Sequence, residues 1–140
     1  ILLSLRETEE LRREETNRGR AMASVLDGMA VSMTPDENRC VQTSQLAGFA
    51  LAAARWQIPT DQAAAGYLWS WLENQVLAGI KIIPLGQTAG HRILLRLDAP
   101  LMKAVAMGLD IMDNDIGTSS PALAIASCRH ETQYTRLYRS

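Results

Sequence analysis

An apolar stretch from Tyr67 to Gly90 constrains the fold of this chain more than any other part of the sequence. It reads YLWSWLENQVLAGIKIIPLGQTAG, which predicts an almost wholly apolar helix followed by a break. The polar exceptions in its helical part are Glu73, Asn74, Gln75 and Lys81. Burying an unpaired charge costs several kcal/mol, so Glu73 and Lys81 must be paired, solvated at an edge, or in contact with a partner. The stretch therefore predicts an interaction surface.

The composition predicts one modest core and no strongly charged surface. Of the 140 residues 47% are hydrophobic and only 5% aromatic, which favours a single domain over residues 1–140 with a core of aliphatic side chains. A net charge of -1 gives no basic field for nucleic acid or an anionic membrane, and we expect neither as a partner. No apolar run is long enough to span a bilayer. Two isolated cysteines, Cys40 and Cys128, fit a reduced, cytoplasmic setting.

The order of helix formers and breakers predicts an all-α fold, a single-domain bundle of about six helices. Since the chain begins at Ile1, without Met and inside a helical pattern, we expect a fragment of a larger all-helical protein. A loop is expected around Pro35, and helices end or bend at Pro84 and Pro100. The expected helices are Leu2–Asp27, Val41–Trp56, Thr60–Ile80 with Thr60 as its cap, a helix after Pro84 through Leu97, Leu101–Leu109, and a last helix from Pro121 almost to Ser140.

Motifs for catalysis are not evident. The Gly86–Gly90 loop lacks the P-loop pattern, and the acidic turn Asp110–Gly117 lacks the spacing of a calcium loop. Cys128 and His130 would point about 200° apart on a regular helix and would not chelate one metal ion. We therefore expect a core thiol and a hydrogen-bonded imidazole there, with no enzyme activity, no cofactor and no metal site.

Charged and aromatic residues mark both ends of the chain. From Arg6 to Arg20 five arginines balance five glutamates, which favours a solvated face. The alternative is a basic ridge for an acidic partner, because Arg6, Arg13 and Arg20 recur every seven residues. In the last helix, the residues expected to face the core are Leu123, Ala126, His130, Tyr134 and Leu137. Tyr134, Tyr138 and Arg139 are of the types that dominate interface energetics, so this end of the chain predicts a binding surface.

Three segments resemble the UreF-type urease accessory proteins, and the similarity covers essentially the whole chain. They are RETEELRREETNRGRAM, YLWSWLENQVLAGIKIIPLGQTAGHRILL and IASCRHETQYTRLYRS. The resemblance implies a non-catalytic, all-helical homodimer that helps install nickel in the urease apoprotein, together with a UreD/UreH-type accessory protein and a UreG-type GTPase, whose GTP hydrolysis it would regulate. The N-terminal part of the family, with its PxGG(F/Y)-like motif, has no counterpart in this sequence.

The resemblance also implies two partner-binding elements. The family's Lys-x-x-Pro-x-Gly-Gln element falls on Lys81, Pro84, Gly86 and Gln87, and we expect it to face the GTPase. The terminal element, expected to order against the UreD/UreH-type partner, includes His130, Glu131, Tyr134, Arg136, Tyr138, Arg139 and Ser140. Glu73 either pairs with Lys81 or lines a polar passage. Two alternatives are a nickel carrier that uses His91, His130 or Cys128, and an unrelated helical interaction domain.

Overall fold

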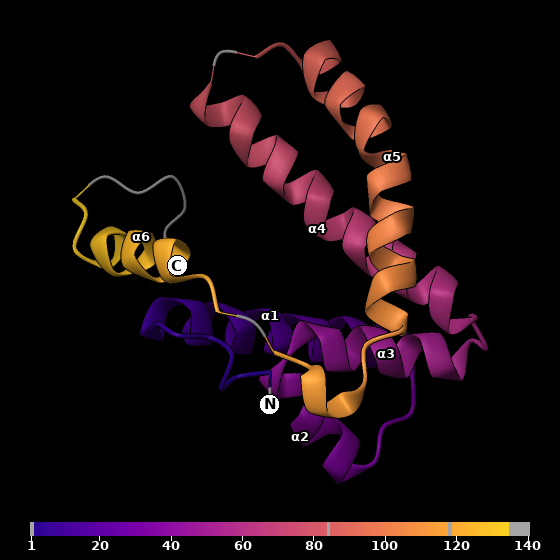
Figure 1. Ribbon diagram of the computed structural model, residues 1–140. Coiled ribbons are helices and arrows are strands. Elements are labelled where there is room, and N and C mark those ends of the chain that lie inside the picture. The colour runs from indigo at the N-terminus through magenta and orange to yellow at the C-terminus, as the bar shows by residue number, and fades with distance from the viewer. Residues whose placement is uncertain (1, 84, 118, 135–140) are drawn as a thin grey trace. The chain divides into compact units, whose positions relative to one another are not determined.

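The fold is all-α, as predicted. The computed structural model describes residues 2–83, 85–117 and 119–134 (Figure 1). Its helices are α1 (Glu9–Gly28), α2 (Pro35–Thr43), α3 (Gln45–Arg55), α4 (Thr60–Ile82), α5 (Gln87–Leu109) and α6 (Pro121–Glu131), with a short 3₁₀ helix η1 (Asp113–Asp115). The chain forms two compact units, of which unit 1 comprises Ile1–Trp56 and Ile116–Ser140 and unit 2 comprises Gln57–Asp115. The assignment of residues 1–140 to a single domain stays a prediction.

The core of unit 1 lies where α1 packs against α2 and α3. Leu26 and Val41 are fully buried there, beside Ala23 and Ala52, so small aliphatic side chains build this core as the composition predicts. Gly19 allows the close approach, because a Cβ atom at this position would lie 2.6 Å from the backbone nitrogen of Ser44. The junction between α2 and α3 therefore packs directly on the backbone of α1.

The first helix begins later than the sequence predicted. Leu2–Leu5 form a turn, and α1 starts at Glu9 behind Thr8, whose hydroxyl accepts a hydrogen bond from the Leu11 amide at 3.3 Å. Thr8 is an N-cap, since its side chain satisfies an amide that has no partner within the helix. The helix-forming composition of residues 2–8 was therefore misleading, because it does not show where the first cap lies.

The loop expected around Pro35 lies only before it, because α2 begins at Pro35 itself. Thr34 and Glu37 form a capping box: the Glu37 amide donates to Thr34 Oγ1 at 3.2 Å, and the Thr34 amide donates to Glu37 Oε2 at 2.8 Å. Pro35 then occupies the first helical position, where its missing N–H costs nothing. The single helix expected over Val41–Trp56 is wrong for a related reason, because Ser44 is extended and caps a new helix, α3.

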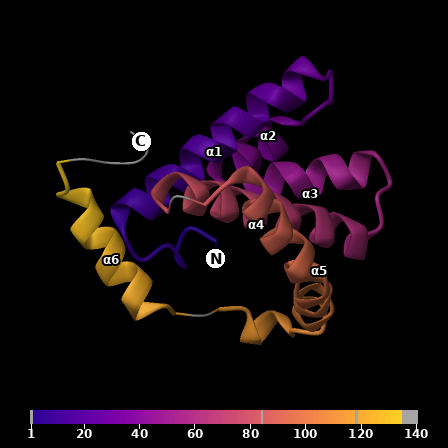
Figure 2. The same cartoon turned by 90° about the horizontal axis from the view of Figure 1, so that it is seen from above.

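Unit 2 is a hairpin of α4 and α5 (Figure 2). The expected helix before Pro84 is confirmed, although the Thr60 cap is wrong, because Thr60 is the first helical residue and makes no capping bond. The break expected at Pro100 is also wrong, because α5 continues through it. Leu94, Leu101 and Val105 are buried on both sides of Pro100. Their burial outweighs the single backbone hydrogen bond that a proline removes.

The last helix is shorter than predicted. Pro121 lies in its first turn, as expected, and Ser120 occupies the N-cap position without a side-chain capping bond, but α6 ends at Glu131 instead of continuing almost to Ser140. The expected apolar stripe is wrong where the structure describes it, since Leu123 is exposed and Tyr134 is fully exposed. Ser127 is the residue that α6 buries among those described. No helix among the described residues combines the length and apolar character that a membrane-spanning segment needs.

Candidate partner-binding surfaces

The turn between α4 and α5 brings the first predicted element together. Lys81 lies in the last turn of α4, where a cation suits the helix dipole, and Gly86 occupies the N-cap position of α5, directly before Gln87. All three residues are exposed. Pro84 lies outside the described residues. The described part of the element is thus presented at one end of the hairpin, where another protein can reach it.

The polar residues of the apolar stretch lie at the surface. Glu73, Asn74, Gln75 and Lys81 are all exposed, so none of them carries the cost of full burial. A helix rises 1.5 Å per residue, so Glu73 and Lys81 are about 12 Å apart along the axis, too far for most direct ion pairs. The pairing of Glu73 with Lys81 stays a prediction, and so does the alternative that Glu73 lines a polar passage.

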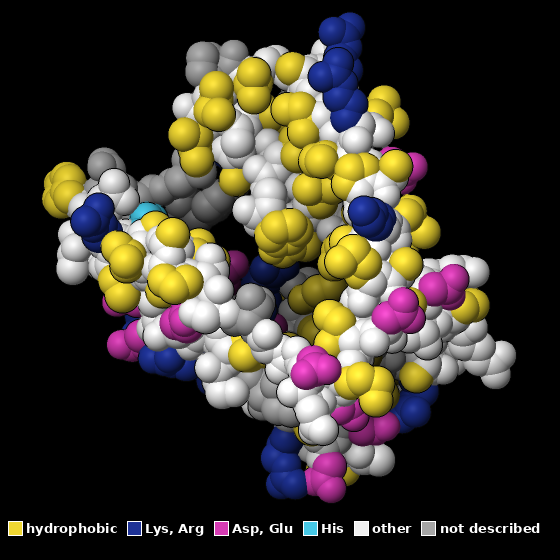
Figure 3. Space-filling model, viewed as in Figure 1, with side chains coloured by type: hydrophobic (Ala, Val, Ile, Leu, Met, Phe, Trp, Pro, Cys, Tyr) yellow, Lys and Arg dark blue, Asp and Glu magenta, His cyan; other side chains and the backbone are white. Residues whose placement is uncertain are grey.

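Apolar side chains cover much of the hairpin, as the space-filling view shows (Figure 3). Leu95, Met102 and Leu109 recur every seven residues along α5 and are 74%, 50% and 48% exposed. An open, wholly apolar pocket of about 180 Å³ is lined by Leu68, Trp71, Leu72, Leu97, Pro100 and Leu101. An exposed Trp beside an apolar pocket is typical of a binding hot spot. The hairpin is therefore the main apolar surface that unit 2 offers to a partner.

The second predicted element is only partly in the described region. His130 and Glu131 face α1: His130 Nδ1 lies 2.7 Å from Glu10 Oε1, and Glu131 Oε1 accepts a hydrogen bond from the Glu10 amide at 2.9 Å. Tyr134 is fully exposed. Arg136, Tyr138, Arg139 and Ser140 lie outside the described residues. The hydrogen-bonded imidazole is confirmed, but the core thiol is wrong, because Cys128 is exposed.

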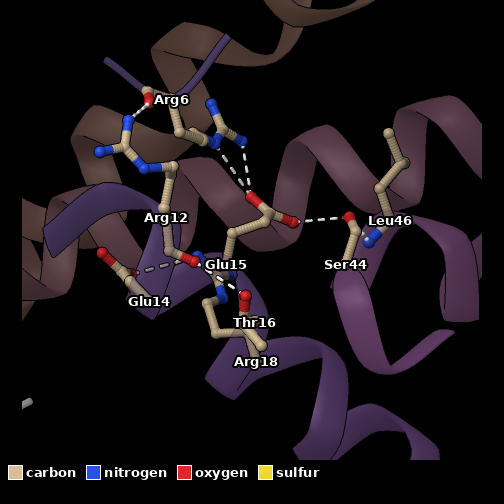
Figure 4. A network of polar contacts seen from close by, with 8 residues as sticks. All are labelled: Arg6, Arg12, Glu14, Glu15, Thr16, Arg18, Ser44 and Leu46. Carbon is tan, nitrogen blue, oxygen red and sulfur yellow. Dashed lines mark hydrogen bonds and ion pairs between the residues drawn. The ribbon is translucent and has the colours of Figure 1, made fainter. Parts of the chain in front are cut away.

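Sequence reasoning missed a buried charge network in unit 1 (Figure 4). Glu15 Oε2 accepts hydrogen bonds from Arg6 Nε at 3.1 Å and Nη2 at 2.7 Å, while Ser44 Oγ donates to Glu15 Oε1 at 2.6 Å. The sequence carried no signal for these pairs, which join residues 9 and 29 positions apart. Because Arg6 precedes α1 and turns back onto it, the basic ridge of Arg6, Arg13 and Arg20 does not form on one helix.

Burial and hydrogen bonding compete at Glu15. Burial raises the pKa of its carboxyl, but the hydrogen bond from Ser44, the hydrogen bonds and charge of Arg6, and the charge of Arg18 together outweigh it and lower the pKa. Glu15 is therefore held as a carboxylate that ties the segment before α1 to the start of α3. This role is structural, and it keeps the surfaces of unit 1 in place.

The described residues contain no group of three or more His, Cys, Asp or Glu side chains that could hold a metal ion.

Several known proteins that are similar to this chain carry the same name. The sequence model of the UreF family matches residues 1–98. A urease accessory protein UreF from Alcanivorax borkumensis is 52% identical over 99% of the chain and 63% of its own length. Proteins of the same name from Pseudomonas putida and Klebsiella pneumoniae are 48% and 45% identical and are covered over 62% of their length. The chain thus spans less than two thirds of these relatives. With a family match over most of its length, the chain belongs to the UreF family.

Proposed function

We propose that the chain acts in urease maturation, as a non-catalytic scaffold that promotes nickel insertion into the urease apoprotein. The observation that carries this proposal is the 45–52% identity, over nearly the whole chain, to proteins named urease accessory protein UreF. In this proposal it works in the cytoplasm, as a homodimer, with a UreD/UreH-type accessory protein and a UreG-type GTPase. It regulates GTP hydrolysis by the second of these partners.

Two elements of this scaffold are assigned as contact surfaces in this proposal. The Lys81–Gln87 turn faces the GTPase, and the charged Lys81 side chain is the group there with the most to contribute to recognition. The terminal element from His130 onward binds the UreD/UreH-type partner. The assignment of the two elements to different partners is supported by their positions in the chain, because the first element belongs to unit 2 and the second to unit 1.

The first surface is tested by Lys81→Ala. We expect lower urease activity in cells that depend on this chain for activation, with unchanged helix content by circular dichroism. Lys103→Ala is the matched control, since Lys103 is an exposed lysine on α5 in the same unit. Equal urease activity with both variants would contradict the contact. Loss of helix content in Lys81→Ala would instead make Lys81 a structural residue.

The second surface is tested by pull-down of the UreD/UreH-type protein. A chain that ends at Cys128 removes the whole terminal element, and we expect it to lose the partner. Tyr134→Ala is the gentler variant, because the side chain of Tyr134 is fully exposed and its removal cannot disturb the core. Unchanged capture by both would sink the assignment of this element.

A further inference from the structure

Polar groups make the contact between α6 and the start of α1. In Figures 1 and 2 α6 lies beside this end of α1, and both helices belong to unit 1. Four contacts join the two sides: Ser119 Oγ donates to Glu7 Oε1 at 2.8 Å, Thr8 Oγ1 lies 2.8 Å from Ser127 Oγ, the Glu10 amide donates to Glu131 Oε1 at 2.9 Å, and His130 Nδ1 lies 2.7 Å from Glu10 Oε1. We call these four contacts the latch.

Apolar burial contributes little to this contact. Leu123 and Ile125 of α6 are each 56% exposed, and Ser127 is the residue that the helix buries among those described. By contrast, α2 is held on α1 by Val41, which is fully buried against Leu26. When a polar contact breaks, both groups bond to water instead, so the net loss of free energy is small. Exposing a buried apolar side chain to water has no such compensation and costs more. α6 is therefore the helix of unit 1 whose release costs least.

The latch is coupled to the start of α1. The Glu10 amide belongs to the first turn, where amides have no partner within the helix, and the Glu131 carboxylate supplies the missing acceptor. The latched state also leaves a polar atom unsatisfied, because Glu10 Oε2 is buried without a hydrogen-bond partner among the residues that the structure describes. When α6 leaves, the Glu10 amide and carboxylate both return to water. Thr8 still caps Leu11, so α1 remains a helix.

We propose that α6 is a releasable arm, which the latch holds on the start of α1 in the free chain and which is freed when the terminal element engages a partner protein. His130 and Glu131 belong to both the latch and the terminal element, and the same atoms cannot bond to α1 and to a partner at once. Gly117 supplies the pivot before α6: its φ of 153° is a conformation that favours glycine. The partner's role rests on the proposed function, whereas the arm itself does not.

A reversible crosslink tests the arm without any partner. Thr8→Cys and Ser127→Cys place two thiols where hydroxyls lie 2.8 Å apart, with Cys40→Ser and Cys128→Ser removing the native cysteines. Hydrogen exchange is measured on the native chain and on the reduced and oxidised forms of this variant. In the native chain, which keeps Thr8 and Ser127, we expect the amides of α6 and of Glu10 to exchange together, at least about tenfold faster than those of α2 and α3. In the variant, oxidation should slow exchange of the same amides at least about tenfold.

Two results would overturn the arm. One is exchange in α6 that is as slow as in α2 and α3, and the other is exchange in α6 that the crosslink leaves unchanged. His130→Ala gives a check that needs no crosslink: it should speed exchange in α6 several-fold and leave α2 and α3 unchanged. His91→Ala is the matched control, since His91 is an exposed histidine of α5 in unit 2 and should leave exchange in α6 as it is.

The same crosslinked chain tests whether binding of a partner requires the release of α6. Its affinity for the immobilised UreD/UreH-type protein is measured with and without reductant, and we expect the oxidised form to bind at least about tenfold more weakly. Equal affinity of the two forms would show that the partner does not need α6 released. If the chain with its native cysteines does not bind at all, the proposed function fails, and hydrogen exchange alone then decides whether the arm exists.

Discussion

At the scale of single residues, Glu15 shows how one buried charge organises its surroundings. Its carboxylate is nearly buried and is bonded to Arg6 on one side and Ser44 on the other. Removing one partner of such a group leaves the others desolvated without compensation. Because Ser44 also caps α3 through the Leu46 amide, the charge of Glu15 fixes where α2 ends and α3 begins.

We expect Glu15→Gln to lower the free energy of unfolding by about 2 kcal/mol at neutral pH, since the charged hydrogen bonds become neutral ones. The pKa of Glu15 is lowered in the folded chain, so its contribution is fully present above the pKa of the unfolded chain and is lost as pH falls through the lower pKa of the folded chain. Denaturant titrations of both proteins at neutral and acidic pH measure this, and the difference between them should shrink in acid.

Glu14→Gln is the matched control for that experiment. Glu14 is the adjacent residue and pairs with Arg18 at 3.5 Å, but it is exposed, so its loss should cost less than about 0.5 kcal/mol. A Glu15→Gln protein no less stable than Glu14→Gln would mean that the buried network does not support the fold.

At the scale of elements, the start of α2 depends on local chemistry. Thr34→Ala removes the side-chain acceptor of the capping box, and we expect it to lower the free energy of unfolding by about 1 kcal/mol. Thr60→Ala is the control, because Thr60 makes no capping bond at the start of α4 and should change stability by less than about 0.5 kcal/mol. Thermal or denaturant unfolding measures both. Similar losses for the two variants would show that the box contributes nothing.

Helix positions were largely predictable from this sequence, and helix ends were not. The apolar stretch before Pro84 and the break after it came directly from composition and proline chemistry, and α4 confirms them. The capping box at Thr34 and Glu37 was readable in the sequence, but Pro35, Asp36 and Asn38 favour turns equally well. Only packing against α1 decides between a turn and a helix there, and packing is not visible in a single sequence.

The face of α6 could not be predicted for a different reason. Apolar periodicity placed Leu123 and Tyr134 in the core, yet α6 turns its polar side to α1. Periodicity shows which residues share a face but not which face finds a partner in the same chain. The same limit applies to the candidate site: Lys81, Gly86 and Gln87 lie near one another because they are close in the sequence, whereas the contact of His130 and Glu131 with Glu10 joins positions about 120 residues apart.

At the scale of the whole molecule, the main question is what the apolar surface of unit 2 does. The helix α4 buries no residue fully among those described, although it is one of the two longest helices. A row of exposed apolar side chains is typical of a surface used for association.

We expect the chain to self-associate through the row formed by Leu95, Met102 and Leu109, with sedimentation velocity showing species larger than a monomer that grow with concentration. Leu95→Lys combined with Met102→Lys should return the chain to a monomer with its helix content unchanged, because both side chains are exposed and their charges stay in water. Met29→Lys, at an exposed methionine directly after α1, is the control and should leave association as it is. If the double variant associates as strongly as the parent chain, the row on α5 is not the contact, and association that Met29→Lys abolishes would move the contact to unit 1.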